Sequence, residues 1–214
     1  MESTDHCKQK CLYEEWMYIQ EQELLELQQA ARLQEEGNYN EANLNQLIEK
    51  IVTNFQEYIE KRCRLARRDV TPYFAPTWCS SLENSGLWIG GCRPSSYIRL
   101  IYALCGLDIE SHLAEFHRGS RTGNIGDLSA TGCDSEESGY DCDENRDLNN
   151  ALDKQDQAMA SVLEEADALR LNTVKEIIKV FTPAQTLDFL AAGKKLRLCM
   201  QEWGKKRDHE HGRN

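Results

Sequence analysis

The stretch LWIGGCRPSS at residues 87–96 carries the residue types of a phosphate-binding loop, namely paired glycines, an arginine and a helix-opening proline. A P-loop follows a strand, separates its glycines by a longer run, and then places lysine and a hydroxyl residue. Here the glycines are adjacent, no lysine follows, and no alternating strand pattern precedes them. The stretch therefore favours a tight turn feeding a helix that opens at Pro94, with Trp88 and Ile89 packed beneath that helix.

Cysteine and histidine side chains could hold zinc, or could act as a nucleophile and its base. His6, Cys7 and Cys11 have the spacing of one half of a zinc site, but the sequence offers no second half. None of the five histidines stands in a recognisable catalytic arrangement, and His209 and His211 fall in a charged tail. The sequence therefore predicts no metal site and no catalytic residues, and we expect that the protein is not an enzyme.

The elements that must position any functional residue are helices. Apolar residues recur at three- and four-residue steps over residues 11–36, from about residue 40 towards Pro72, and again from residue 148 onwards. Gly37 supplies a stop for the first of these helices. Thr182 and Pro183 supply a start for the last one. No stretch shows the alternation of a strand, so we predict an all-α bundle of long amphipathic helices.

Composition limits the classes of function. The 214 residues carry a formal net charge of −11, which argues against a surface built to bind nucleic acid. The first residues lack the apolar core of a signal peptide, and no apolar run approaches the roughly 18 residues of a membrane span. Nine scattered cysteines form no repeated Cys-x-x-Cys pattern, so we expect free thiols and a location in the nucleus and cytoplasm.

Local composition divides the chain. Residues 119–147 are small, polar and acidic, and such a stretch cannot bury enough apolar surface to offset its ordering entropy. We predict a disordered acidic insertion there, inside one domain that spans residues 11–207. Residues 1–10 are expected to form a flexible N-terminus, and residues 208–214 a charged tail.

Five blocks of sequence carry a family resemblance. LWIGGCRPSS followed by YIRLIYALCG resembles the signature of the plant Delay of Germination domain, which also follows the zipper in TGA-type bZIP transcription factors. Further blocks match the family in order, namely YEEWMYIQ, YFAPTWCSSLEN, ALDKQDQAMASVLEEADALR and TPAQTLDFLAAGKKLRLCMQEWG. Together they cover nearly the whole chain outside residues 119–147, and the domain at residues 11–207 is identified as a member of this family.

The resemblance implies a non-enzymatic regulator that acts by protein–protein docking in seed dormancy and abscisic acid signalling. Type 2C protein phosphatases are the expected partners. The alternative is an adaptor that associates with TGA-type bZIP factors, without direct DNA contact, because no basic region with heptads precedes the domain. No membrane contact is expected, and homo-oligomerisation is left open.

The segment of the family that contacts the phosphatase corresponds to residues 11–20. Its pattern is matched by Tyr13, Glu15, Trp16, Met17 and Gln20. A bulky tryptophan and a flexible methionine near a chain terminus suit a helix that binds in a partner's groove. Alternatively, Trp16 anchors its own helix to the bundle, and the sequence leaves both interpretations open.

The resemblance also raises the question of haem. The family's dormancy member binds haem and carries two histidines one helical turn apart, at positions that correspond to Arg197 and Gln201 here. Arginine stays protonated and has no lone pair to donate, and a glutamine amide is a poor ligand for iron. We therefore predict no haem binding at this helix, and no cofactor.

Overall fold

The computed structural model describes residues 4–37, 40–107 and 144–212, with residues 144–149 described as backbone only. The elements in chain order are α1 (Thr4–Glu35), α2 (Glu41–Ala66), a short 3-10 turn (Thr71–Tyr73), α3 (Ser81–Ser85), α4 (Ser95–Leu104), α6 (Glu144–Val180) and α7 (Pro183–Glu210). The described residues form no strand, only an isolated bridge between Trp88 and Gly91. The predicted all-α fold of long helices is confirmed for this part of the chain.

The helix boundaries follow local signals in the sequence. The Asn40 side chain accepts a hydrogen bond from the Ala42 amide and caps α2. Thr182 caps α7 in a full capping box with Gln185. Beyond α1, Gly37 adopts a φ of 73°, a left-handed conformation that glycine adopts without steric cost. The helices therefore begin and end where their own residues favour it.

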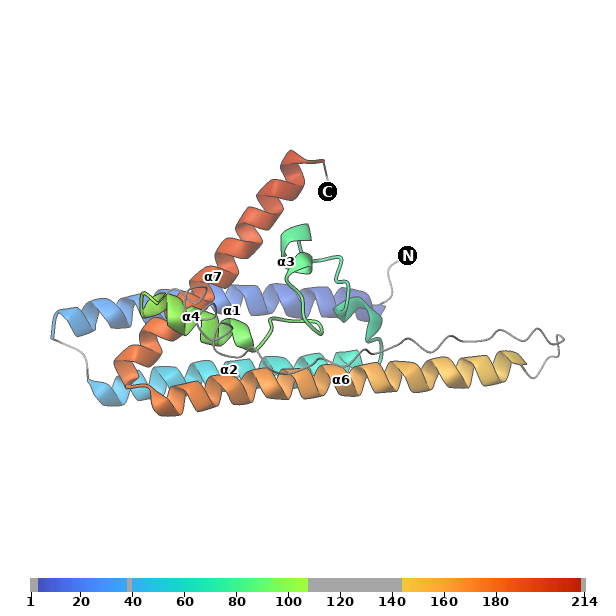
Figure 1. The fold of residues 1–214 in the computed structure, drawn as a ribbon, viewed down its shortest axis with the longest axis horizontal. Coiled ribbons are helices and arrows are strands. Elements are labelled where there is room, and N and C mark those ends of the chain that lie inside the picture. Colours follow the sequence, from blue (N-terminus) through green and yellow to red (C-terminus); the bar gives the residue numbers. More distant parts are fainter. Residues whose placement is uncertain (1–3, 38–39, 108–143, 213–214) are drawn as a thin grey trace, which may run out of the picture.

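Three long helices lie alongside one another and α7 crosses them (Figure 1). Helix α1 packs on α2 and α7, α2 packs on α6, and α3 and α4 both pack on α7. The larger core joins α1, α2, α6 and α7; its buried members include Leu27, Ile51, Val174, Leu187 and Phe189. A smaller core lies between the end of α2, the loop that follows it and the middle of α6.

Both ends of the domain are more helical than the sequence analysis predicted. Residues 4–10, assigned to a flexible N-terminus, are part of α1 because Gln9 is buried and donates to the Asp69 carbonyl at 2.6 Å. Residues 208–210, assigned to the tail, are part of α7, where Asp208 accepts a hydrogen bond from the Ser81 amide at 2.8 Å. Helix α6 begins at Glu144, so residues 144–147 of the predicted insertion are helical, as their lack of glycine and proline allows. The rest of that insertion, residues 119–143, lies outside the described residues.

Candidate docking site on the first helix

The five predicted docking residues lie on two sides of α1. Tyr13, Met17 and Gln20 are buried inside the fold, with exposed fractions of 6–7%. Trp16 is half-buried and Glu15 is exposed, and both line a groove between α1 and α2. The structure therefore does not bring the five residues together on one surface. In this conformation, only Glu15 and Trp16 are within reach of a partner.

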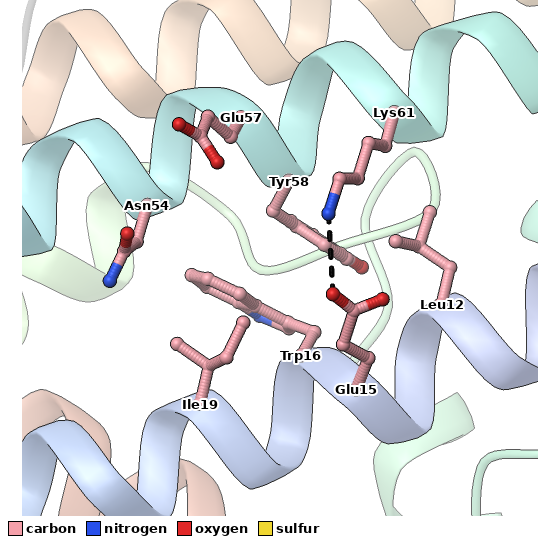
Figure 2. Close-up of a pocket in the computed structure, with 8 residues that line it drawn as sticks. All are labelled: Leu12, Glu15, Trp16, Ile19, Asn54, Glu57, Tyr58 and Lys61. Atoms are coloured by element: carbon pink, nitrogen blue, oxygen red, sulfur yellow. Dashed lines mark hydrogen bonds and ion pairs between the residues drawn. The ribbon is translucent and has the colours of Figure 1, made fainter.

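The groove has an aromatic wall (Figure 2). The Trp16 ring stacks on Tyr58 at 4.3 Å between ring centroids and lies 5.7 Å from the Phe55 ring. At the rim, Lys61 forms an ion pair with Glu15 at 3.2 Å. The remaining lining residues are Leu12, Ile19, Asn54 and Glu57. The arrangement is an apolar slot with a charged edge, which suits the recognition of a side chain.

Tyr13 is the centre of a polar network beneath α7. Its hydroxyl donates to Glu83 at 2.6 Å and accepts from the Gln201 amide at 3.1 Å. The Arg197 guanidinium lies 5.8 Å from the Tyr13 ring centroid and 3.4 Å from Glu83. Burial, which outweighs the opposing effect of Arg197, raises the pKa of the Tyr13 phenol. The hydroxyl therefore stays protonated and works as a structural link.

The same network answers the question of haem at α7. Arg197 and Gln201, the positions that correspond to the family's histidine pair, are both used to hold α7 against α1 and the α3 region. Arginine is a cation and the Gln201 amide nitrogen is already a donor to Tyr13. These two side chains do not fit an iron site.

A second polar link joins α7 to α1 one turn further along. The Lys194 ammonium contacts the Glu23 carboxylate and also donates to Gln20 at 3.2 Å. Asn54 of α2 donates to the other oxygen of Glu23 at 2.8 Å. Burial lowers the pKa of Lys194, while the Glu23 carboxylate acts in the opposite direction. Lys194 also lies 6.0 Å from the Trp16 ring centroid, so the polar link and the groove share a wall.

A buried cluster of three charges was not predicted from the sequence. Arg62 of α2 and Arg170 of α6 both donate to one oxygen of Asp167, at 3.1 and 2.6 Å, and the three residues are at most 4% exposed. Burial alone would lower the pKa of Arg62, but Asp167 and nearby phenols raise it. Two features of the sequence could have indicated this burial. Arg62 follows Ile59 by three residues and so shares its apolar helix face, and Arg170 follows Asp167 by three residues, a spacing at which the two can pair.

The double-glycine loop supplies the remaining partners of the two arginines. Arg62 donates to the Gly90 carbonyl at 2.6 Å, and Arg170 donates to the carbonyls of Trp88, Ile89 and Cys92. The loop thus presents carbonyl oxygens to cations, which is the opposite of a phosphate cradle. The loop is a structural turn, as predicted. Trp88 and Ile89 do not lie beneath α4, however, because Ile89 packs on the smaller core and the Trp88 ring lies under the Arg170 guanidinium.

The described residues offer no metal centre. No group of three or more histidine, cysteine, aspartate or glutamate side chains in this part of the chain is placed to hold a metal ion. Cys7 and Cys11 are exposed on α1, whereas His6 packs on Trp78 and lies 2.9 Å from the Thr77 hydroxyl. No helix within the described ranges is long and apolar enough to cross a membrane.

Comparison with known proteins places the chain in a family. A family profile described as "Seed dormancy control" matches residues 23–103. Protein DOG1-like 3 of Arabidopsis thaliana is 37% identical over 94% of this chain and 86% of its own length, and Protein DOG1-like 1 of the same plant is 34% identical over 97% and 92%. Transcription factor TGA1 of Arabidopsis is 25% identical, and the chain spans 55% of it. The chain belongs to the Delay of Germination family of plant regulatory proteins.

Proposed function

We propose that this protein is a non-enzymatic docking regulator and that its partner binds in the α1–α2 groove. The observation that carries the proposal is the position of Trp16, which lines the groove and remains partly exposed. Tryptophan is the residue type most enriched among binding hot spots. The family supports a regulatory role, since a profile described as "Seed dormancy control" matches this chain and Protein DOG1-like 3 is similar to nearly all of it.

The groove would recognise its partner by shape and charge. A partner's apolar side chain would insert beside Trp16 and Tyr58, and the Glu15–Lys61 ion pair at the rim would orient its backbone or a polar neighbour. Tyr13, Met17 and Gln20 would act indirectly, by holding α1 in place against the rest of the bundle. Glu15 and Lys61 are paired with each other at the rim, and the activity proposed for the groove is binding.

Type 2C protein phosphatases are the first candidate partners. The expected setting is dormancy and abscisic acid signalling, in the nucleus and cytoplasm. Support comes from the match of Tyr13, Glu15, Trp16, Met17 and Gln20 to the segment through which the family's dormancy member binds these enzymes. Such a partner would contact the protein without being its substrate.

The test is phosphatase capture by groove variants. Trp16→Ala should weaken capture of a purified type 2C phosphatase about 30-fold, the effect of losing a hot spot of about 2 kcal/mol. Because Trp16 also stacks on Tyr58, a rim variant, Lys61→Ala, is measured alongside it. Tyr18→Ala, on the exposed side of the same helix, is the matched control and should bind normally. Normal capture by both groove variants, or equal loss in the control, would refute the proposal.

A second candidate is an adaptor for TGA-type bZIP factors. The observation in its favour is that Transcription factor TGA1 matches 89% of this chain, so both proteins share the domain. In that case TGA factors, rather than phosphatases, should co-purify from seed extract. A mobility-shift assay should then show a change of the DNA complex only when a TGA factor is present.

A further inference from the structure

Helix α7 has two different faces, and one of them packs against the rest of the protein. Its inner face carries Lys194, Arg197, Gln201, Gly204 and Asp208 at three- and four-residue steps, and each of these residues contacts α1, α3 or the loop before α3. Gly204 approaches the Ser80 side chain so closely that an added Cβ would collide with it. The helix is therefore fixed in place, and its opposite face points away from the bundle.

The outward face of α7 carries an apolar stripe. Leu196, Cys199 and Trp203 follow one another at three- and four-residue steps and so lie on one side of the helix. Leu196 is 50% exposed and Trp203 is 66% exposed, although tryptophan is highly buried on average. We call these three residues the α7 stripe. In Figure 1 the C-terminal half of α7 projects beyond the long helices.

Cations border the α7 stripe. Lys195, Lys206 and Arg207 are exposed and lie on or next to the same side of the helix, which they share with the exposed carboxylates Glu202 and Glu210. Two other helices also carry exposed apolar residues seven positions apart, but these residues lie on either side of a glutamate on the same helix face. Tyr18 and Leu25 of α1 enclose Glu21, and Val162 and Leu169 of α6 enclose Glu165.

We propose that the α7 stripe is a second docking surface, which binds an acidic amphipathic helix of a partner protein. Apolar anchors of such a helix would pack on Leu196 and Trp203, and its carboxylates would meet Lys206 and Arg207. Charge favours this occupant over a nucleic acid or an anionic membrane. Glu202, Asp208 and Glu210 interrupt the cations of this helix end and would repel an extended polyanion, whereas a short helix can place its carboxylates at Lys206 and Arg207 alone.

This surface is separate from the α1–α2 groove, because no residue of the stripe lines that groove. The two proposals can therefore fail independently. A loss of binding at the α7 stripe should leave phosphatase capture through Trp16 unchanged, and the reverse should also hold.

The test uses the full chain and a synthetic probe. The probe is a fluorescein-labelled peptide of about 18 residues, with leucines at helical three- and four-residue steps and glutamates at most other positions. A scrambled peptide of the same composition is the ligand control. Fluorescence anisotropy should show saturable binding of the amphipathic peptide, weaker by at least about 10-fold for the scrambled one.

Matched variants locate the binding. Trp203→Ala and Leu196→Ala should each weaken binding about 10-fold or more. Their controls are Tyr18→Ala and Leu169→Ala, whose side chains have similar exposure, 62% and 50%, but carboxylate neighbours. The double change Lys206→Glu with Arg207→Glu should weaken binding and reduce its dependence on salt. Circular dichroism and the unfolding midpoint should stay close to those of the parent protein, because these side chains have few contacts within the chain.

Several results would overturn the proposal. They are an absence of saturable binding, equal binding of the scrambled peptide, and equal loss in the control variants. Sedimentation showing a dimer that dissociates in Trp203→Ala would mean that a second copy occupies the stripe. Flotation with phosphatidylserine-containing vesicles that is lost in Trp203→Ala would identify a membrane surface instead.

Discussion

Among the described residues, Asp167 is the one carboxylate that pairs with two buried guanidinium groups, and its replacement offers the sharpest test of how this fold is held together. The carboxylate is 1% exposed, and Arg62 and Arg170 are 4% and 2% exposed. In Asp167→Asn the shape is retained, but both cations keep only neutral acceptors, the loop carbonyls of residues 88–92. Removing one partner of a buried ion pair costs about 3–5 kcal/mol, because a charge is left uncompensated in the core.

The matched control is Glu164→Gln on the same helix. Glu164 also binds an arginine, the α2 C-cap residue Arg67, at 2.6 Å, but this pair is far more exposed, with side-chain exposures of 68% for Arg67 and 28% for Glu164. An exposed pair contributes about 0–1 kcal/mol. Urea unfolding followed by circular dichroism should therefore separate the two variants by at least about 2 kcal/mol, with Asp167→Asn also lowering Tm by about 6–20 °C. Equal losses in both variants would refute the argument that burial of the charge decides its contribution.

Three further predictions follow from the same contacts. Gly37→Ala should destabilise the protein by about 1 kcal/mol, because Gly37 has a positive φ. Gly90→Ala should destabilise it by more, because Gly90 also has a positive φ and its added Cβ would lie 2.5 Å from a guanidinium nitrogen of Arg62. Urea unfolding midpoints of the two variants test this difference. Lys194→Met should cost about 3–5 kcal/mol, and adding Glu23→Gln should restore more than half of it, whereas no recovery in the double variant would mean that the two side chains are not coupled. Burial raises the pKa of the Cys79 thiol to about 11, so iodoacetamide at pH 8 should label the exposed cysteines of α1 first, and Cys79 should react only as the pH rises towards that value; early labelling of Cys79, read by mass spectrometry, would contradict its burial.

Much of the fold could be predicted because its signals are local. Asn40, Thr182 and Gly37 sit at helix ends that their side chains or their conformational freedom favour, and the structure places the boundaries there. Periodicity also identified the apolar stripes that fill the larger core. It failed at residues 4–10, where polar side chains hide a helix that is held by a distant contact, from Gln9 to Asp69.

The docking site was only partly predictable. Sequence pattern selected a stretch of α1 and its tryptophan, and the structure does place Trp16 at a groove. The sequence pattern could not show that Tyr13, Met17 and Gln20 are buried by the rest of the bundle, because their burial depends on where α7 lies. A helical period shows which residues share a face, but it does not show which neighbour that face meets.

By itself, then, the sequence determined the helices, their caps and the family, since each depends on residues close together in the chain or on matching blocks. Only the tertiary structure decided which charges are buried. Arg62 and Asp167 are 105 positions apart, and the loop that completes their coordination lies between them in the chain. A buried charge is tolerated only when opposite charge and hydrogen-bond acceptors converge on it from several elements, and no local pattern encodes that convergence.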